Sequence, residues 1–318
     1  MSISKKTAKV IAALSALPLL AALAGCATTS DAAGSGSSDA NETVKVGVVG
    51  KSDPQWPAFV DAAAAEGITV EIVDFGDYAQ PNPALSAGDL DLNQFQHIVY
   101  LADYNVSSGE DLAVIGSTAI YPLGLYSTKY DSVADIPAGE TVAVPDDASN
   151  LARALLVLQS AKLIELKDGG SIFSGLNDVD EAKSKVKVTA LEAALTATSL
   201  PDVAAAVINN DFVQDAGLTF ADAIAQDDPN DANALPYVNI FAARAEDKDN
   251  ATYKKLVEIF QTDEAVQAGL LEASGDTAVA LQTPVADLEK SLAKVEADTE
   301  AARHEGEQRV GFRGGDLG

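Results

Sequence analysis

Cysteine and histidine are nearly missing from this sequence. Cys26 is the only cysteine among 318 residues, and His97 and His304 are the only histidines. One thiol cannot form an internal disulfide, so the folded part must gain its stability from its hydrophobic core. The same scarcity argues against a metal centre, because no second histidine or thiol stands at ligand spacing. We therefore expect neither a metal nor a cofactor.

Basic residues are also few. The chain has 21 Lys and Arg against 48 Asp and Glu, a formal net charge of −27. Residues 1–25 contain three lysines and no acid, so losing them takes the net charge from −27 to −30. A chain this acidic is not expected to bind nucleic acid or an anionic lipid surface through its charge.

The N-terminus has the layout of a secretory signal. Lys5, Lys6 and Lys9 precede an apolar run in residues 1–25 that is too short to read as a membrane-spanning helix. The run ends at Cys26 in "LAGC", which resembles the lipobox of bacterial lipoproteins, where the cysteine is lipidated and becomes the new N-terminus. The alternative is a chance cysteine after an ordinary signal peptide. Since a leftover thiol in a secreted chain calls for a reason, we predict lipidation and anchorage on the extracytoplasmic face of the cell membrane.

The rest of the chain divides by composition and pattern. Residues 26–43 are rich in Ser, Gly, Ala and Thr, which is typical of a flexible tether. Beyond them, β-branched runs such as 43–50 and 68–75 alternate with helical stretches, including predicted helices over 88–106 and 252–261. This alternation predicts an α/β fold with parallel sheets and a ligand site outside the carboxyl ends of strands.

Two proline-containing segments, near 120 and near 235, are placed to carry the chain between two lobes. We therefore assign 44–122 and 238–282 to lobe 1 and 123–237 to lobe 2, with a ligand cleft between the lobes. Residues 283–318 add a helix, with Val285, Leu288, Leu292 and Val295 on one face, and then a glycine-rich, disordered tail. We expect a monomer.

Motifs of enzymes are weak or missing. Gly50, Lys51 and Ser52 follow a strand as in a phosphate-binding loop, but that motif needs a glycine where Lys45 stands. We find no Gly-x-Ser-x-Gly elbow and no His-Glu-x-x-His pair. A binding protein is favoured over an enzyme or a structural surface lipoprotein.

Arg153 is the main candidate for binding an anion. Ser149 or Asn150 is predicted to cap the helix that contains it, so that the arginine lies near the helix start. A cation there opposes the helix dipole unless an anion is present. A guanidinium and free helix N–H groups together suit a carboxylate. An equally weighted alternative is that Arg153 pairs with a surface aspartate.

The remaining candidates also have ordinary explanations. His97 could be a core histidine bonded to a backbone carbonyl, and Tyr78, Phe95 and Tyr100 could be core residues. Asn209 and Asn239 end or interrupt apolar strands, where an amide either caps backbone groups or faces a polar ligand. These residues alone do not decide between structure and ligand binding.

Four segments together resemble the methionine-binding lipoproteins of the MetQ/NlpA type, the substrate receptors of methionine ABC importers. In chain order they are "DYAQPNPALSAGDLDLNQFQHIVYL", "SNLARALLVLQSAKL", "VAAAVINNDFVQDAGL" and "PYVNIFAARAEDKD". The resemblance covers residues 43–282. It implies a two-lobed, periplasmic-binding-protein-like fold that captures L-methionine and delivers it to an ABC permease. Another apolar amino acid or a methionine-containing dipeptide is the alternative ligand.

The resemblance also implies roles for individual residues. It places a side-chain pocket at Tyr78, Phe95, His97 and Tyr100, where a thioether gains from sulfur–aromatic contacts. It implies that Arg153 binds the ligand carboxylate, and that Asn209 and Asn239 accept hydrogen bonds from its ammonium. The sequence departs from the family at Ala152, where glycine is usual, and at Gln94, where an aromatic is common. Its first loop also differs, and Trp56 in that loop is expected to contact or cover the cleft.

Overall fold

The structure, a computed structural model, describes residues 43–231 and 234–313, with side chains up to His304. The chain divides into two units, Met1–Ala40 and Asn41–Gly318, and the described residues belong to the second. The predicted signal peptide, Cys26 and nearly all of the tether lie outside the described residues, as does the end of the tail. In the part that is described, no helix is long and apolar enough to cross a membrane.

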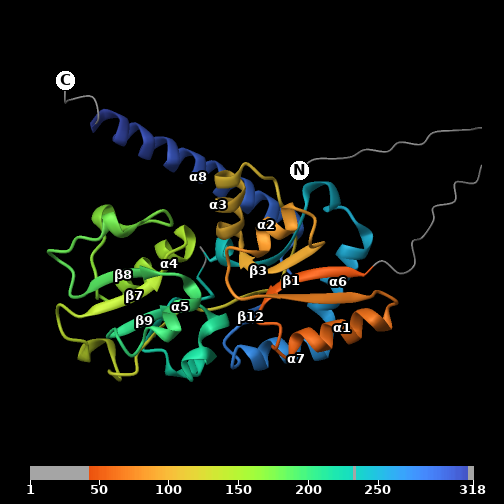
Figure 1. Ribbon diagram of the computed structural model, residues 1–318, viewed down its shortest axis with the longest axis horizontal. Coiled ribbons are helices and arrows are strands. Elements are labelled where there is room, and N and C mark those ends of the chain that lie inside the picture. The colour runs from red at the N-terminus through yellow and green to blue at the C-terminus, as the bar shows by residue number, and fades with distance from the viewer. Residues whose placement is uncertain (1–42, 232–233, 314–318) are drawn as a thin grey trace, which may run out of the picture. The chain divides into compact units, whose positions relative to one another are not determined.

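The first sheet combines strands from both ends of the folded chain (Figure 1). Its order is β2-β1-β3-β11-β4, in which β1 pairs in parallel with β2 and β3, and β11 runs antiparallel to β3 and β4. The strands are β1 (Val44–Val49), β2 (Val70–Phe75), β3 (Leu92–His97), β4 (Ala113–Ser117) and β11 (Asn239–Ala243).

Helices cover both faces of this sheet. On one face, α1 (Gln55–Ala65), α6 (Ala251–Thr262) and α7 (Glu264–Ala273) form a core that includes Phe59, Phe241 and Phe260. On the other face lie α2 (Pro81–Ser86), α3 (Ile98–Ser108) and α8 (Val285–Arg313), around Leu101 and Ile240. Figure 1 shows the two helix layers above and below the orange strands.

The second sheet is built from the middle of the chain and has the order β10-β6-β9-β7-β8. Its strands are β6 (Gly124–Tyr126), β7 (Thr141–Pro145), β8 (Lys187–Leu191), β9 (Ala205–Ile208) and β10 (Ala225–Gln226). The helix α4 (Ala148–Ser160) buries Leu155 and Leu158 against one face, and α5 (Ala193–Thr198) covers the other. A two-stranded sheet joins β5 (Ala119–Ile120) to β12 (Val279–Ala280).

Short 3-10 helices occupy many of the connections. They span Val133–Asp135, Lys167–Gly169, Leu176–Asp178, Asn210–Phe212, Gln214–Ala216, Phe220–Asp222, Leu235–Tyr237 and Ala245–Asp247. Two connections run between the sheets: the chain leaves β5 for β6 through 121–123 and returns from β10 to β11 through 227–238. We call the units around the first and second sheets lobe 1 and lobe 2, and keep the boundaries 44–122 with 238–282, and 123–237, as a proposal.

The predicted helix over 88–106 is wrong in its first half. Residues 92–97 form β3, a fully buried strand at the centre of the first sheet, and only 98–108 are helical. The apolar run alone does not separate a buried strand from a helix. The Asn93 and Gln96 side chains of β3 are satisfied by each other and by Asn82, whose Oδ1 accepts from Asn93 at 2.9 Å and from Gln96 at 2.6 Å. That long-range amide cluster removes the cost of burying them in a strand.

The predicted cap of α4 is also wrong by a few residues. Asp147 is the N-cap, and its Oδ1 accepts the backbone N–H of Asn150 at 2.9 Å. The helix therefore starts at Ala148, and Arg153 lies in its second turn. The helix-dipole argument for an anion at Arg153 loses weight, because that effect is confined to the first turn.

The C-terminal helix α8 packs on α3 and β4. Three of the four residues predicted for its apolar face are buried, Leu288, Leu292 and Val295, whereas Val285 is 39% exposed. Its described helical span ends at Arg313.

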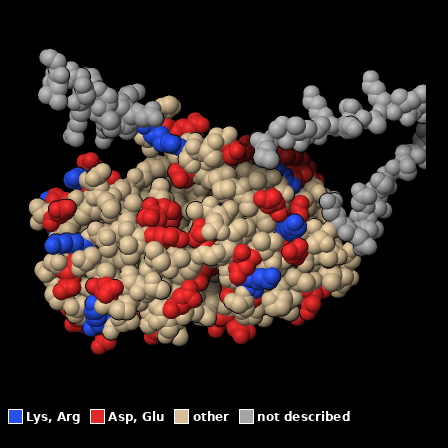
Figure 2. Space-filling view, in the orientation of Figure 1, with Lys and Arg blue, Asp and Glu red and all other residues tan. Residues whose placement is uncertain are grey.

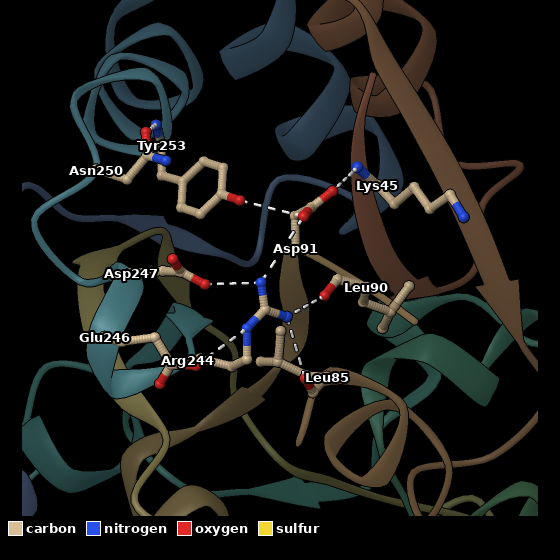
Figure 3. A network of polar contacts seen from close by, with 9 residues as sticks. All are labelled: Lys45, Leu85, Leu90, Asp91, Arg244, Glu246, Asp247, Asn250 and Tyr253. Atoms are coloured by element: carbon tan, nitrogen blue, oxygen red, sulfur yellow. Dashed lines mark hydrogen bonds and ion pairs between the residues drawn. The ribbon is translucent and has the colours of Figure 1, made fainter. Parts of the chain in front are cut away.

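A polar network fixes the edge of lobe 1 where β3 begins and β11 ends (Figure 3). Arg244 donates to the carbonyl oxygens of Leu85 and Leu90, at 3.3 Å and 2.5 Å, and pairs with Asp247 at 2.7 Å. Asp91 in turn accepts from the Lys45 backbone at 2.8 Å. On the face shown in Figure 2, acidic side chains are spread widely and basic ones are sparse, as the net charge implies.

Candidate ligand-binding site

The structure brings all seven predicted site residues to one buried cavity. Tyr78, Phe95, His97, Tyr100, Arg153, Asn209 and Asn239 line it, together with Gln96, Tyr121, Asn150 and Asn210. The seven predicted residues come from the loop before α2 and from β3, α3 and β11 in lobe 1, and from α4 and the end of β9 in lobe 2. The cavity volume is about 20 Å³, which holds roughly one water molecule. An amino acid can therefore enter only if the lobes or the lining side chains move.

Aromatic rings form one wall of this cavity. The ring centre of Tyr78 lies 5.9 Å from that of Phe95 and 6.2 Å from that of Tyr100, and Phe95 and Tyr100 are 5.6 Å apart. The Tyr100 hydroxyl donates to the backbone oxygen of Tyr78 at 2.9 Å. The rings are thus held in place by one another and by the backbone, and present an apolar, polarizable surface.

His97 ends β3 and caps α3. Its Nδ1 accepts the backbone N–H of Tyr100 at 3.1 Å, and its Nε2 lies 3.3 Å from Asn150 Oδ1. Because Nδ1 is an acceptor, the neutral ring carries its proton on Nε2 and donates it to Asn150. Burial, and the nearby charge of Arg153, lower the pKa of His97 to about 3. The ring is therefore neutral near pH 7. The acceptor of its N–H is the side-chain oxygen of Asn150, so the alternative of a backbone carbonyl partner is wrong.

Two asparagines extend this network into lobe 2. Asn150 Oδ1 also accepts from Asn209 Nδ2 at 3.0 Å, while Asn150 Nδ2 donates to Asp147 at 3.0 Å. Asn209 is 7% exposed, and its Oδ1 has no hydrogen-bond partner among the described residues. A buried acceptor left without a partner is costly. The Asn209 oxygen is suited to accept a hydrogen bond from a ligand donor, such as an ammonium group.

Arg153 pairs with an aspartate, as one of its two alternatives predicted, and it also lines the candidate cavity. Its Nε pairs with Asp227 Oδ2 at 2.7 Å, and Asp227 is partly exposed, as a surface partner would be. The same arginine lines the small cavity, donates from Nη2 to the backbone oxygen of Tyr121 at 2.8 Å, and lies 4.5 Å from the ring centre of Tyr237. It also lines a second cavity of about 390 Å³.

A third cavity, of about 240 Å³, adjoins the first and shares Phe95, Tyr121, Asn210 and Asn239 with it. It is acidic: Asp53, Asp74, Asp211 and Asp215 line it. Burial raises the pKa of Asp211 to about 7 and that of Asp53 to about 6. Within the described residues, no group of three His, Cys, Asp or Glu side chains is arranged to hold a metal ion.

Two of the departures singled out in the sequence, Gln94 and Trp56 of the first loop, lie at this third cavity, whereas Ala152 is fully buried in α4. Trp56 lines the cavity, but the side chain is only 2% exposed and packs on Phe59 and Phe260 in the core of lobe 1. Gln94 lines it as well and donates from Nε2 to Thr118 Oγ1 at 3.0 Å.

Several lining residues were not singled out from the sequence as ligand-site residues. Asn150 was considered only as a helix cap, although its spacing of three from Asp147 is the signal that links the cap to the site. Asp227 and Tyr237 lie in the return connection between the lobes, and no local pattern marks them. They reach Arg153 only because the chain folds back past α4.

Comparisons with known proteins agree with this geometry. Residues 44–280 match the NlpA lipoprotein family. A probable D-methionine-binding lipoprotein MetQ from Pasteurella multocida (strain Pm70) is 38% identical over 266 residues, covering 82% of this chain and 95% of that protein.

Two solved structures are also similar. The substrate-binding protein of a methionine transporter from Streptococcus pneumoniae has a TM-score of 0.70 and 35% identity, covering 75% of this chain and 95% of that one. A nutrient-binding protein from Burkholderia cenocepacia bound to methionine has a TM-score of 0.69 and 39% identity, covering 74% of this chain and 99% of that one.

Two α/β lobes with a buried cavity lined from both of them define a substrate-binding protein of the periplasmic type, so the predicted fold class is confirmed. The length of the match to the family and the sequence identity to its members show which family the chain belongs to. The chain belongs to the NlpA lipoprotein family, which confirms the resemblance seen in the sequence.

Proposed function

We propose that this protein captures L-methionine outside the cytoplasm and delivers it to the permease of an ABC importer. The observation that carries the proposal is the cavity between the lobes, where an aromatic wall, an arginine and an unpartnered amide oxygen meet. Each element suits one part of a free amino acid with an apolar side chain. The names of the relatives, which refer to methionine, support the same ligand.

The aromatic wall would receive the side chain. Tyr78, Phe95 and Tyr100 present ring faces and edges to the cavity. A thioether gains about 0.3–1.5 kcal/mol from each sulfur–aromatic contact. His97, neutral and hydrogen-bonded on both nitrogens, adds a polar but uncharged edge, so an apolar ligand side chain meets no buried charge there.

Arg153 and the asparagines would bind the main-chain groups of the ligand. A guanidinium pairs with a carboxylate through charge-assisted hydrogen bonds. The Asn209 Oδ1 and the Asn239 side chain would accept from the ammonium, which is an all-donor group. A ligand that lacks the carboxylate or the ammonium would leave Arg153 or the asparagines without a partner. We therefore expect amides and esters of methionine to bind more weakly.

The remaining parts of the proposal concern location and partners. Lipidation of Cys26 would hold the protein at the extracytoplasmic face of the cell membrane, with 26–43 as a tether. We propose a monomer that binds its ligand without altering it, since the site contains no nucleophile paired with a base. A permease is the expected protein partner, and lobe closure over the ligand would present the loaded form to it.

Calorimetric titration tests the proposal. The full chain, unfolded and refolded beforehand to remove any bound ligand, would be titrated with L-methionine, D-methionine, L-leucine and a methionine-containing dipeptide. We expect L-methionine to bind most tightly. We expect Arg153→Ala to lose at least a hundredfold in affinity and Arg153→Lys, which keeps the charge but not the fork, to lose less.

The outcomes separate the alternatives. A preference of more than tenfold for another ligand would replace L-methionine in the proposal, and the D-enantiomer matters here because the relatives are named for it. Recovery of a chemically altered ligand after incubation would point to an enzyme. No binding of any amino acid by correctly refolded protein would favour a structural surface lipoprotein.

A further inference from the structure

Arg153 lies where both connections between the lobes converge. The outgoing connection, 121–123, supplies the backbone oxygen of Tyr121, which accepts from Nη2 at 2.8 Å. The return connection, 227–238, supplies the Asp227 carboxylate at 2.7 Å from Nε and the Tyr237 ring, 4.5 Å from the guanidinium carbon. The arginine on α4 is therefore held by the two segments that any hinge motion must bend.

Asp227 is itself fixed by the outgoing connection. Its second carboxylate oxygen, Oδ1, accepts the backbone N–H of Leu123 at 2.8 Å, and its own N–H donates to the Leu123 oxygen at 3.3 Å. Both oxygens of Asp227 are thus engaged, one by the arginine and one by the hinge backbone. The Asp227 side chain is 28% exposed, against 7% for that of Arg153.

These contacts leave a defined part of the guanidinium available. Nε and one Nη2 hydrogen are used, and Nη1 makes no hydrogen bond to any residue that the structure describes. The two hydrogen bonds, from Nε and Nη2, and the ring against the face fix the plane of the group. The edge that remains is the one that a ligand carboxylate can meet.

We propose that Asp227 is a positioning residue for ligand binding: it holds Arg153 through Nε so that the free guanidinium edge faces the ligand carboxylate. This inference rests on the proposed function. Asp227 also links Arg153 to the backbone of both connections between the lobes. A ligand that binds Arg153 therefore acts on the segments that bend when the lobes move. Asp227 touches no ligand itself.

A competing role for Asp227 makes the opposite prediction. If the aspartate only occupied Arg153 until a ligand displaced it, its removal would strengthen carboxylate binding. The geometry favours positioning, because Asp227 bonds to Nε rather than to the Nη1 edge and is tied by its other oxygen to Leu123. Preorganising a binding group in this way increases affinity by lowering the ordering cost.

The test compares two ligands that differ at the carboxylate alone. L-Methionine and L-methioninamide would be titrated into the full chain, wild type and Asp227→Ala, with Asp228→Ala as the matched neighbouring control. We expect Asp227→Ala to weaken L-methionine binding at least tenfold and to change methioninamide binding less than threefold. Asp227→Asn, which keeps one acceptor oxygen, should lie between wild type and Asp227→Ala, and Asp228→Ala should resemble wild type.

Other results overturn the inference. Tighter methionine binding by Asp227→Ala would assign the competing role, and an equal loss for both ligands would assign a purely structural one. Unchanged binding would show that Arg153 needs no such support. If Asp227→Ala does not fold, the ratio of the L-methionine and L-methioninamide affinities of Asp227→Asn is measured instead and distinguishes the same roles. The wild type is measured first, and its failure to bind methionine would contradict the proposed function itself.

Discussion

The hydroxyl of Tyr78, in the loop before α2, donates a hydrogen bond of 2.6 Å to Oδ2 of Asp211, which follows β9. This contact joins lobe 1 to lobe 2 at the edge of the candidate site. Asp211 is partly buried and also accepts from Asn210. The charge of Asp53, in lobe 1, contributes to the rise in the pKa of Asp211. Asp53 and Asp211 line the same cavity, and no Lys, Arg or His lines it with them.

A pH dependence of ligand binding follows from this contact. In the closed form, burial raises the pKa of Asp211 to about 7 and that of Asp53 to about 6. Opening the lobes would return both carboxyls to water, where an aspartate has a pKa of about 3.9. Protons therefore bind the closed form more tightly, and closure is favoured fully below about pH 4 and less as the pH rises through 6 and 7.

We accordingly expect methionine affinity, measured by calorimetry, to be several-fold to about tenfold higher at pH 5.5 than at pH 8. His97 should not contribute, since its pKa of about 3 keeps it neutral across this range. Asp211→Asn should flatten the profile, whereas Asp202→Asn, at an exposed position, should not. A wild-type affinity that rises with pH would contradict the argument.

The unpartnered oxygen of Asn209 leads to a second prediction. Asn209→Ala removes an acceptor proposed for the ligand ammonium and the hydrogen bond to Asn150 Oδ1. Loss of a hydrogen bond to a charged group costs about 1.5–3 kcal/mol, so methionine affinity should fall roughly ten- to a hundredfold. The exposed turn variant Asn230→Ala is the control. Equal affinities of the two variants would remove Asn209 from the ligand contacts.

The Arg244 network separates stability from binding (Figure 3). Arg244 holds two backbone oxygens and a carboxylate but lies outside the candidate cavity. We expect Arg244→Ala to lower the free energy of unfolding by about 2–4 kcal/mol in urea denaturation, because it leaves partly buried acceptors without a donor. Methionine affinity of the folded variant should stay within threefold of wild type.

Lys248→Ala is the matched control for that experiment, because its ion pair with Glu289 spans 3.6 Å between exposed side chains. Exposed pairs contribute about 0–1 kcal/mol. A stability loss for Lys248→Ala as large as that for Arg244→Ala would mean that the network in Figure 3 has no special role.

The helix α8 offers a fourth prediction, since it begins after the residues that match the family, 44–280. Leu288 is fully buried against lobe 1. Truncating a buried leucine costs about 2–5 kcal/mol, so Leu288→Ala should lower the unfolding free energy by that order. Leu235→Ala, at a residue 37% exposed, should cost much less. A Leu288→Ala variant as stable as wild type would show that α8 is not part of the cooperative fold.

Much of the architecture could be read from local patterns. The β-branched runs 43–50 and 68–75 predicted β1 and β2, because side chains that suit a pleated, buried surface recur along them. The strand β3 was missed in favour of a helix. Its buried amides depend on Asn82 from another element, and no local pattern reveals a partner ten or more residues away.

For the site, the order of residues along the chain fixes which side chains are available: one arginine on α4, the aromatic cluster with His97, and two asparagines at strand ends. Their contacts depend on the folded arrangement of the lobes. It pairs Arg153 with Asp227, joins His97 and Asn209 through Asn150, and leaves Asn209 Oδ1 without a partner among the described residues. Hydrogen-bond partners are set by which segments the fold brings within about 3 Å, and in these pairs the partners come from segments far apart in the chain.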